Sequence, residues 1–165
     1  MKVLVVYESM WGNTRDIAET IAERLGPDVP VIDVTQAPPQ LPPDLDLLVV
    51  GGPTHAFSMS RDSTRRDAVQ KGAPTGHESI GIREWLEALP AADTIDVATF
   101  DTRVSKVRRL PGSAAKAAGK AVRHSHLGRV VASESFYVDD MEGPLHEGEL
   151  DHARAWAASL AGQNS

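Results

Sequence analysis

Residues 2–25 read KVLVVYESMWGNTRDIAETIAERL, and three structural signals follow one another in this stretch without a break. Residues 3–7 form a short apolar and β-branched run, which is typical of a strand covered on both faces in a parallel sheet. From Asn13 onward, apolar residues recur at helical spacing as far as Leu25. The stretch therefore predicts a strand that passes through the polar loop 8–14 directly into an amphipathic helix.

The loop at residues 8–14 has the chemistry of an anion site. We expect Asn13 or Thr14 to cap the helix, and the N–H groups of the loop to lie at the positive end of the helix dipole. Ser9 and Thr14 add hydroxyl groups, and Gly12 lets the backbone approach a ligand closely. The loop lacks both the Gly-Lys-Ser/Thr of a nucleoside-triphosphate site and the three glycines of a dinucleotide site. On this local sequence alone, a phosphate-binding loop and an ordinary capped helix without a ligand are equally good interpretations.

The composition limits the classes of protein to which the chain can belong. A length of 165 residues favours one domain, residues 1–165. The net charge of −6 argues against a general nucleic-acid or anionic-membrane surface. The chain has no cysteine, which excludes disulfides, thiolate nucleophiles and iron–sulfur ligation, so redox chemistry would need a bound cofactor. No apolar run reaches transmembrane length, and we expect a cytoplasmic protein without membrane insertion.

Strand and helix signals alternate along the rest of the chain. Strands are expected near 29–34, 45–50, 95–100 and 130–138, and helices near 63–70, 82–89, 113–125 and 150–160. Pro30 within the first of these segments indicates a strand at the edge of the sheet. The alternation predicts an α/β fold, a doubly wound parallel sheet of five strands joined by right-handed crossovers.

Three polar loops follow strands of this sheet, at residues 8–14, 53–65 and 101–109. In doubly wound sheets, ligands bind beyond the carboxyl ends of the strands, near the point where the strand order switches. The loops therefore predict a site, but any such fold would bring them together, so they do not identify the ligand. The polar segment 53–81 is long for a connection, as functional or mobile loops often are.

Two sequence patterns resemble the flavodoxin family. They are YESMWGNT, residues 7–14, before the first helix, and VVGGPTHAFSMSR, residues 49–61, at the end of the third strand. The resemblance covers essentially the whole chain. It implies a flavodoxin-like doubly wound sandwich with strand order 2-1-3-4-5, in which FMN is held noncovalently at the switch point.

The resemblance also assigns the residues of the cofactor site. The loop around the FMN phosphate would comprise Ser9, Met10, Trp11, Gly12, Asn13 and Thr14. The loop that flanks the isoalloxazine ring would comprise Pro53, Thr54, His55, Ala56 and Phe57. The third loop, against the pyrimidine edge, would comprise Asp101, Thr102 and Arg103. Trp11 and Phe57 are candidates for the flat aromatic wall that a flavin ring prefers.

Three functions stay open at this point. The resemblance favours an electron carrier that works between a reductase and an acceptor protein. Trp11, where electron-transfer flavodoxins usually carry Thr, is more similar to the FMN-dependent NAD(P)H:quinone reductases of the same fold, which act on a quinone-like small molecule. The third alternative is a flavodoxin-fold interaction module that has lost FMN. It is motivated by the hydroxyl missing at Trp11 and by the carboxylate of Glu8 at the start of the loop.

Two features of the loops allow more than one interpretation. Arg103, Lys106, Arg108 and Arg109 place four cations within seven residues. They could compensate the anion of a reduced flavin or receive an acidic or phosphorylated partner, or they could be a solvated basic stretch before a helix. His55 could hydrogen-bond the flavin or relay a proton to a quinone, although a loop histidine more often caps or shields its neighbours.

Other chemistries have little support in the sequence. His124 and His126 lie at a helix end with no third ligand nearby, so we expect no metal site. Ser9 has no recognisable His and acid partners, and no G-x-S-x-G elbow occurs, which argues against a serine hydrolase. A phospho-receiver needs an Asp at the end of its third strand, where this chain has Gly51 and Gly52. We therefore expect no catalytic side chain apart from the cofactor.

Overall fold

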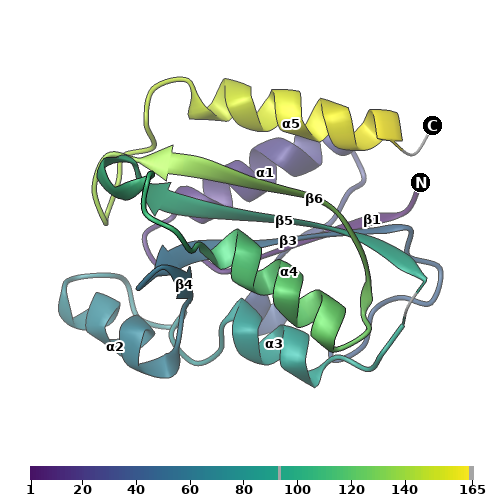
Figure 1. Cartoon of the computed structure of the whole chain (residues 1–165), viewed down its shortest axis with the longest axis horizontal. Helices are drawn as coiled ribbons and strands as arrows, with labels where there is room; N and C mark the ends of the chain where they lie inside the picture. The colour runs from purple at the N-terminus through teal and green to yellow at the C-terminus, as the bar shows by residue number, and fades with distance from the viewer. Residues whose placement is uncertain (93, 164–165) are drawn as a thin grey trace.

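The computed structural model describes residues 1–92 and 94–163 and contains a parallel sheet between two layers of helices (Figure 1). The strands of the main sheet are β1 (Val3–Tyr7), β2 (Val31–Asp33), β3 (Leu47–His55), β5 (Ile95–Val104) and β6 (Gly128–Val138). Their order is β2-β1-β3-β5-β6, and every neighbouring pair is parallel. The two-residue strand β4 (Ser58–Met59) pairs antiparallel with the end of β3. Apart from β4, this is the predicted five-stranded sheet with the order 2-1-3-4-5.

Four helices cover the two faces of the sheet. Helices α1 (Asn13–Leu25) and α5 (Glu149–Gln163) lie on one face, and α3 (Ile82–Ala88) and α4 (Ala114–His124) lie on the other (Figure 1). A fifth helix, α2 (Asp62–Gln70), lies beyond β4 at one end of the sheet. None of the helices in the described ranges combines the length and the apolar character needed to cross a bilayer.

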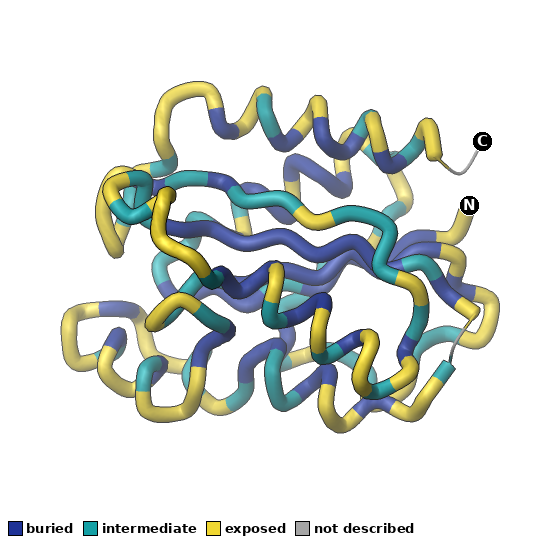
Figure 2. The backbone as a smooth tube through the Cα atoms, in the orientation of Figure 1, coloured by how far each residue is buried: buried dark blue, intermediate teal, exposed yellow. Residues whose placement is uncertain are grey.

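The apolar run in β1 is divided between two cores. Val3 and Val5 pack into the core beneath α1 and α5, whereas Leu4 and Val6 pack into the core beneath α3 and α4. Figure 2 shows the resulting buried centre of the sheet, with exposed residues concentrated on the outer faces of the helices and in the loops. Burial on both faces is the reason that β1 reads as a continuous apolar run, as predicted.

Two strands end later than predicted, because backbone pairing continues beyond their apolar residues. Strand β3 continues past Gly51 to His55, since Pro53 still lies opposite Thr102 of β5. Strand β5 likewise continues past the predicted start of a loop at Asp101, because β6 pairs with it as far as Val104. Polar side chains therefore lie within the strand ends at the site.

Two local predictions are wrong. The N-cap of α1 is Gly12, in the left-handed conformation with φ 98°, rather than Asn13 or Thr14. The helical spacing of Leu150 with Ala153, Trp156, Ala157 and Leu160 predicts a buried Leu150, but this residue is 39% exposed, because it lies in the first turn of α5, away from the face that packs on the sheet. The other residues expected on that face, namely Ala153, Trp156, Ala157 and Leu160, are buried.

A glycine next to an aromatic ring joins the two central strands. Gly51 of β3 lies opposite Phe100 of β5, and a Cβ atom on Gly51 would overlap the Phe100 ring. The ring is also held edge-on by Phe136 and Trp156, with centroid separations of 6.2 and 6.3 Å. Phe100 therefore has little room to move away from a side chain at position 51.

We expect Gly51→Ala to lower the free energy of unfolding by about 1–3 kcal/mol, because the added methyl group overpacks a fixed aromatic cluster. Chemical denaturation measures this change. The matched control is Gly162→Ala in α5, where a Cβ atom would meet nothing within 4 Å. The control should be neutral or slightly stabilising, and equal stabilities for the two variants would contradict the packing described here.

Candidate functional site

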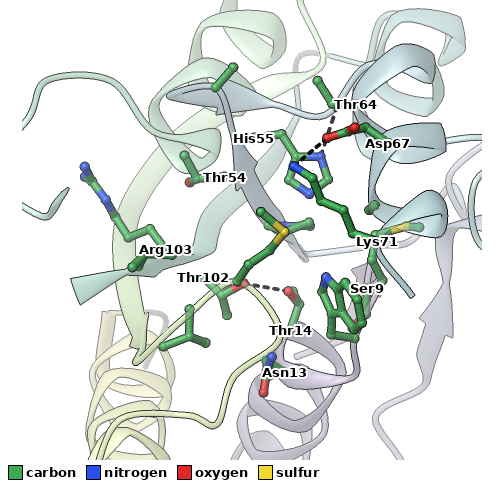
Figure 3. Close-up of a pocket in the computed structure, with 18 residues that line it drawn as sticks. Ser9, Asn13, Thr14, Thr54, His55, Thr64, Asp67, Lys71, Thr102 and Arg103 are labelled. Carbon is green, nitrogen blue, oxygen red and sulfur yellow. Dashed lines mark hydrogen bonds and ion pairs between the residues drawn. The ribbon is translucent and has the colours of Figure 1, made fainter. Parts of the chain in front are cut away.

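A cavity of about 320 Å³ lies at the carboxyl ends of β1, β3 and β5 (Figure 3). This volume is within the range of small-molecule sites in proteins. All three predicted loops contribute to its lining. The predicted site residues that line it are Ser9, Met10, Trp11, Asn13, Thr14, Pro53, Thr54, His55, Ala56, Thr102 and Arg103.

Three predicted residues lie outside the lining. Gly12 is the N-cap of α1, and its positive φ forms the turn into the helix. Asp101 is fully buried and accepts a hydrogen bond from the Ala115 N–H at 2.9 Å. Phe57 is 47% exposed and lies on the outer surface. Trp11 is thus the aromatic side chain of the cavity, and Phe57 is not part of its wall.

The start of α1 forms one end of the cavity. Its N-cap, Gly12, supplies no side chain to cap the helix, so the N–H groups of the first turn keep their capacity to bind an anion. The Gly12 N–H donates to Ser9 Oγ at 3.0 Å, which fixes the shape of the loop. Thr14 Oγ1 and Thr102 Oγ1 share a hydrogen bond of 2.8 Å (Figure 3). This end of the cavity suits a phosphate held by N–H and hydroxyl groups.

Trp11 lies between the first loop and α2. It packs against a small apolar cluster that contains Met10, Ala68 and Ala73. Its indole Nε1 is buried and has no hydrogen-bond partner among the described residues. Arg103 also lines the cavity, and its buried Nε likewise has no hydrogen-bond partner among the described residues. Buried donors of this kind are rare in proteins, and two of them among the lining residues fit a ligand with acceptor atoms.

The α2 region, including Lys71 just after the helix, supplies most of the lining that was not among the assigned site residues. Thr64, Asp67, Ala68 and, just beyond the helix, Lys71 reach the cavity. Lys71 forms an ion pair with Asp67 at 2.9 Å. The sequence indicated a short helix here, but α2 has no long apolar face from which its orientation could be derived.

The remaining unpredicted lining residues are Val104, Val138 and Met141, at or just beyond the ends of β5 and β6. Val104 and Val138 lie opposite each other in the sheet. The position of Met141 could have been found from topology, because the loop after the fifth parallel strand also emerges at the carboxyl edge. Asn13 Nδ2 donates to the carbonyl of Glu142 at 3.1 Å and so ties this loop to the start of α1.

Glu8, at the start of the first loop, faces away from the cavity. Its buried carboxylate accepts hydrogen bonds from Ser60 Oγ and from the Ile82 N–H, the latter at 2.9 Å. Burial raises the pKa of Glu8, while these hydrogen bonds and the nearby Arg65 oppose the rise. The carboxylate therefore belongs to the junction with α3 and does not line the anion end of the site.

Arg65 of α2 completes this junction. It is 1% exposed and donates to Ser60 Oγ at 2.8 Å, to the carbonyl of Glu78 at 3.1 Å and to the carboxylate of Glu84. A buried guanidinium is stable only when such partners surround it. The network holds α2, and with it one wall of the cavity, against the sheet and α3.

His55 lines the cavity at the end of β3, and its Nδ1 hydrogen-bonds Thr64 Oγ1 at 3.0 Å (Figure 3). Burial, assisted by the positive charge of Arg65, lowers the pKa of His55 from 6.5 to about 4. The imidazole is therefore neutral at pH 7, where it can donate one hydrogen bond and accept another.

We expect the free energy of unfolding to fall as the pH is lowered from about 6.5 to about 4. In this window the unfolded chain binds a proton at His55 that the folded chain does not bind. Chemical denaturation at a series of pH values measures the effect. The His55→Gln variant should lack the part of the pH dependence that comes from protonation of His55. An NMR titration that gave a midpoint near 6.5 for His55 would contradict it.

The sequence matches no protein-family model and no curated protein. Several solved structures are nevertheless similar over the whole chain. Oxidised flavodoxin 1 from Bacillus cereus has a TM-score of 0.67 at 15% identity, with 100% of both chains covered. A Fusobacterium nucleatum flavodoxin bound to flavin mononucleotide has a TM-score of 0.61 at 12% identity, with 99% of both chains covered.

A flavodoxin, WrbA-like protein from Agrobacterium tumefaciens is also similar, with a TM-score of 0.57 at 19% identity. The alignment covers 98% of this chain and 96% of that one. At such identities the likeness establishes the fold. The chain has the flavodoxin fold along its length, which confirms the architecture expected from residues 7–14 and 49–61.

Proposed function

We propose that the chain binds FMN in the cavity at the carboxyl edge of the sheet and carries electrons between a reductase and an acceptor. The observation that supports this most directly is the uncapped start of α1, which adjoins a cavity walled by an indole. The first feature suits the phosphate of FMN and the second its ring. FMN, when bound, would supply the redox chemistry.

The phosphate would lie against residues 9–14. Ser9 and Thr14 offer hydroxyl groups there, and the first turn of α1 offers N–H groups at the positive end of the helix dipole. No cation is needed for such a site. Lys71, on the α2 wall, is already paired with Asp67.

The isoalloxazine ring would lie against the apolar part of the cavity. Trp11 offers the flat surface, and Val104 and Val138 at the ends of β5 and β6 add apolar contacts. Thr54 is held in place because its Oγ1 accepts a hydrogen bond from the Ala114 N–H at 3.0 Å. His55, neutral at pH 7, would orient polar atoms of the ligand without adding charge.

A second function, an FMN-dependent NAD(P)H oxidoreductase with a quinone-like substrate, is favoured by the α2 wall. Thr64, Asp67 and Lys71 of this wall add polar groups beside His55. A cavity wall of this kind offers contacts to a second ligand. The third function, an interaction module without FMN, rested on the hydroxyl missing at Trp11 and on the carboxylate of Glu8. The second reason no longer supports it, because Glu8 is directed toward Ser60 and Ile82.

The experiment that tests the proposal is an absorbance spectrum of the protein after saturation with FMN and desalting, followed by anaerobic addition of NADPH and then dithionite. We expect FMN to be retained, left oxidised by NADPH and reduced by dithionite. Fast reduction by NADPH alone would instead establish the oxidoreductase. Protein that retains no FMN would contradict both functions and leave the interaction module.

Two serine variants make the same experiment specific to the phosphate loop. Ser9→Ala should weaken FMN binding by about 10-fold or more, since a hydrogen bond to a charged group contributes about 1.5–3 kcal/mol. Ser105→Ala, outside the cavity lining, is the matched control and should bind FMN like the unmodified protein. Equal losses in both variants would contradict the placement of the phosphate.

A further inference from the structure

We propose that one rim of the cavity is a docking surface for a partner protein that carries carboxylates around an apolar centre. The rim consists of the exposed cations Lys106, Arg108 and Arg109 together with the exposed apolar side chains Phe57 and Leu110, and we call it the basic rim. The inference rests on the proposed function, because the partner would be the protein that exchanges electrons through the cavity.

Exposed apolar side chains gather at this edge of the molecule. Phe57, Leu110 and Met141 are 47%, 48% and 47% exposed, and the other large apolar side chains exposed in the described residues are Met1 and Leu150. Phe57 directly follows the cavity-lining Ala56, and Met141 lines the cavity itself. Clustered exposed apolar surface is typical of interaction sites rather than of solvated surface.

The backbone at the exposed Phe57 and at its neighbour Ala56 is strained. Ala56 and Phe57 both have left-handed conformations, with φ of 48° and 63°. Such conformations cost of order 1–2 kcal/mol for each residue with a side chain. The carbonyl of Phe57 also lies where a Cβ atom on Gly112 would approach it to 2.7 Å, so Phe57 packs closely on the loop that carries Leu110. The two exposed apolar side chains therefore belong to one surface.

The cations of the basic rim are free to interact with a partner. Within residues 1–92 and 94–163, the side chains of Lys106, Arg108 and Arg109 form no ion pair. Their charge is opposite in sign to the net charge of −6 of the whole chain. An approaching protein would thus meet a local positive field on a negative molecule, which steers association and fixes orientation.

Arg103 holds the basic rim at a fixed position relative to the cavity. Its Nη2 donates to the carbonyls of Val107 at 3.2 Å and Leu110 at 3.0 Å. These two residues lie in and just after the short helix η2 (Ser105–Val107). Because Arg103 itself lines the cavity, it joins the exposed loop to the cofactor site.

The loop after β6 has acidic residues that complement this arrangement. Asp139 is paired with His146 at 2.7 Å, and Asp140 accepts a hydrogen bond from the Met141 N–H at 2.8 Å. Glu142 adds a further negative charge beside them. A carboxylate-rich partner would be attracted by the basic rim and repelled by this loop. The cavity edge therefore selects both the charge and the orientation of the partner.

The local field can be measured with small redox probes of opposite charge. FMN-loaded, dithionite-reduced protein is mixed in a stopped-flow instrument with ferricyanide or with a trivalent cationic cobalt(III) complex, each an acceptor of one electron. We expect the ferricyanide rate to fall, and the cobalt rate to rise, as the ionic strength increases. The net charge of −6 alone would repel ferricyanide and attract the cobalt complex, so that the ferricyanide rate would rise and the cobalt rate would fall with ionic strength. That result would overturn the proposal.

Charge-reversal variants assign the field to the basic rim. Arg108→Glu with Arg109→Glu should lower the ferricyanide rate by about 10-fold at low ionic strength. The matched control is Arg24→Glu with Lys120→Glu, which changes the net charge by the same amount at exposed positions on α1 and α4 outside the cavity lining. Equal effects in the two variants would show that the net charge, and not the rim, controls the rate.

A second measurement does not depend on FMN. A glutamate-rich peptide with a central Leu and Phe is titrated into the ¹⁵N-labelled chain without cofactor, and amide shifts are mapped by NMR. We expect salt-sensitive shifts at Phe57 and residues 105–112 that disappear in the Arg108→Glu, Arg109→Glu variant. No shifts, or shifts elsewhere, would overturn the docking surface. Failure to retain FMN would contradict only the proposed function.

Discussion

Apolar side chains cover both faces of β1 and β3, and this burial constrains where a ligand can bind. The two cores leave no room for a site on either face of the sheet, so polar groups collect at its carboxyl edge. Buried Arg65 adds the second constraint, because its bonds to Ser60, Glu78 and Glu84 fix α2 above that edge. The cavity lies between these two rigid parts.

Much of this could be predicted from local sequence, since the signals involved are local. The apolar run of β1 and the loop of residues 8–14 predict a strand, a turn and a helix, and alternation of such units predicts the parallel sheet. The features that could not be predicted depend on contacts distant in sequence. The orientation of α2 depends on Arg65, and the extension of β5 beyond Asp101 depends on its pairing with β6. The exposed Phe57 lies in a left-handed turn with Ala56, a conformation that both residue types disfavour.

Neutral hydrogen-bond donors and exposed cations lie in separate parts of the site. The anion end of the cavity uses neutral groups, namely the uncapped N–H groups of α1 and the hydroxyls of Ser9 and Thr14. The exposed cations lie at the rim, where Arg103 holds their loop. Phosphate binding and partner recognition would thus use separate residues, so that a change in one need not impair the other.

In the proposed complex, the start of α1 would hold the phosphate of FMN while Trp11 would contact its ring. ¹H–¹⁵N NMR spectra recorded with FMN, and separately with riboflavin, which lacks the phosphate, distinguish the phosphate contact from the ring contact. This placement of FMN predicts that the amides of Gly12, Asn13 and Thr14 shift with FMN but not with riboflavin, and that the indole N–H of Trp11 shifts with both ligands. Identical shifts of these amides with the two ligands, or no shift of the indole, would contradict it.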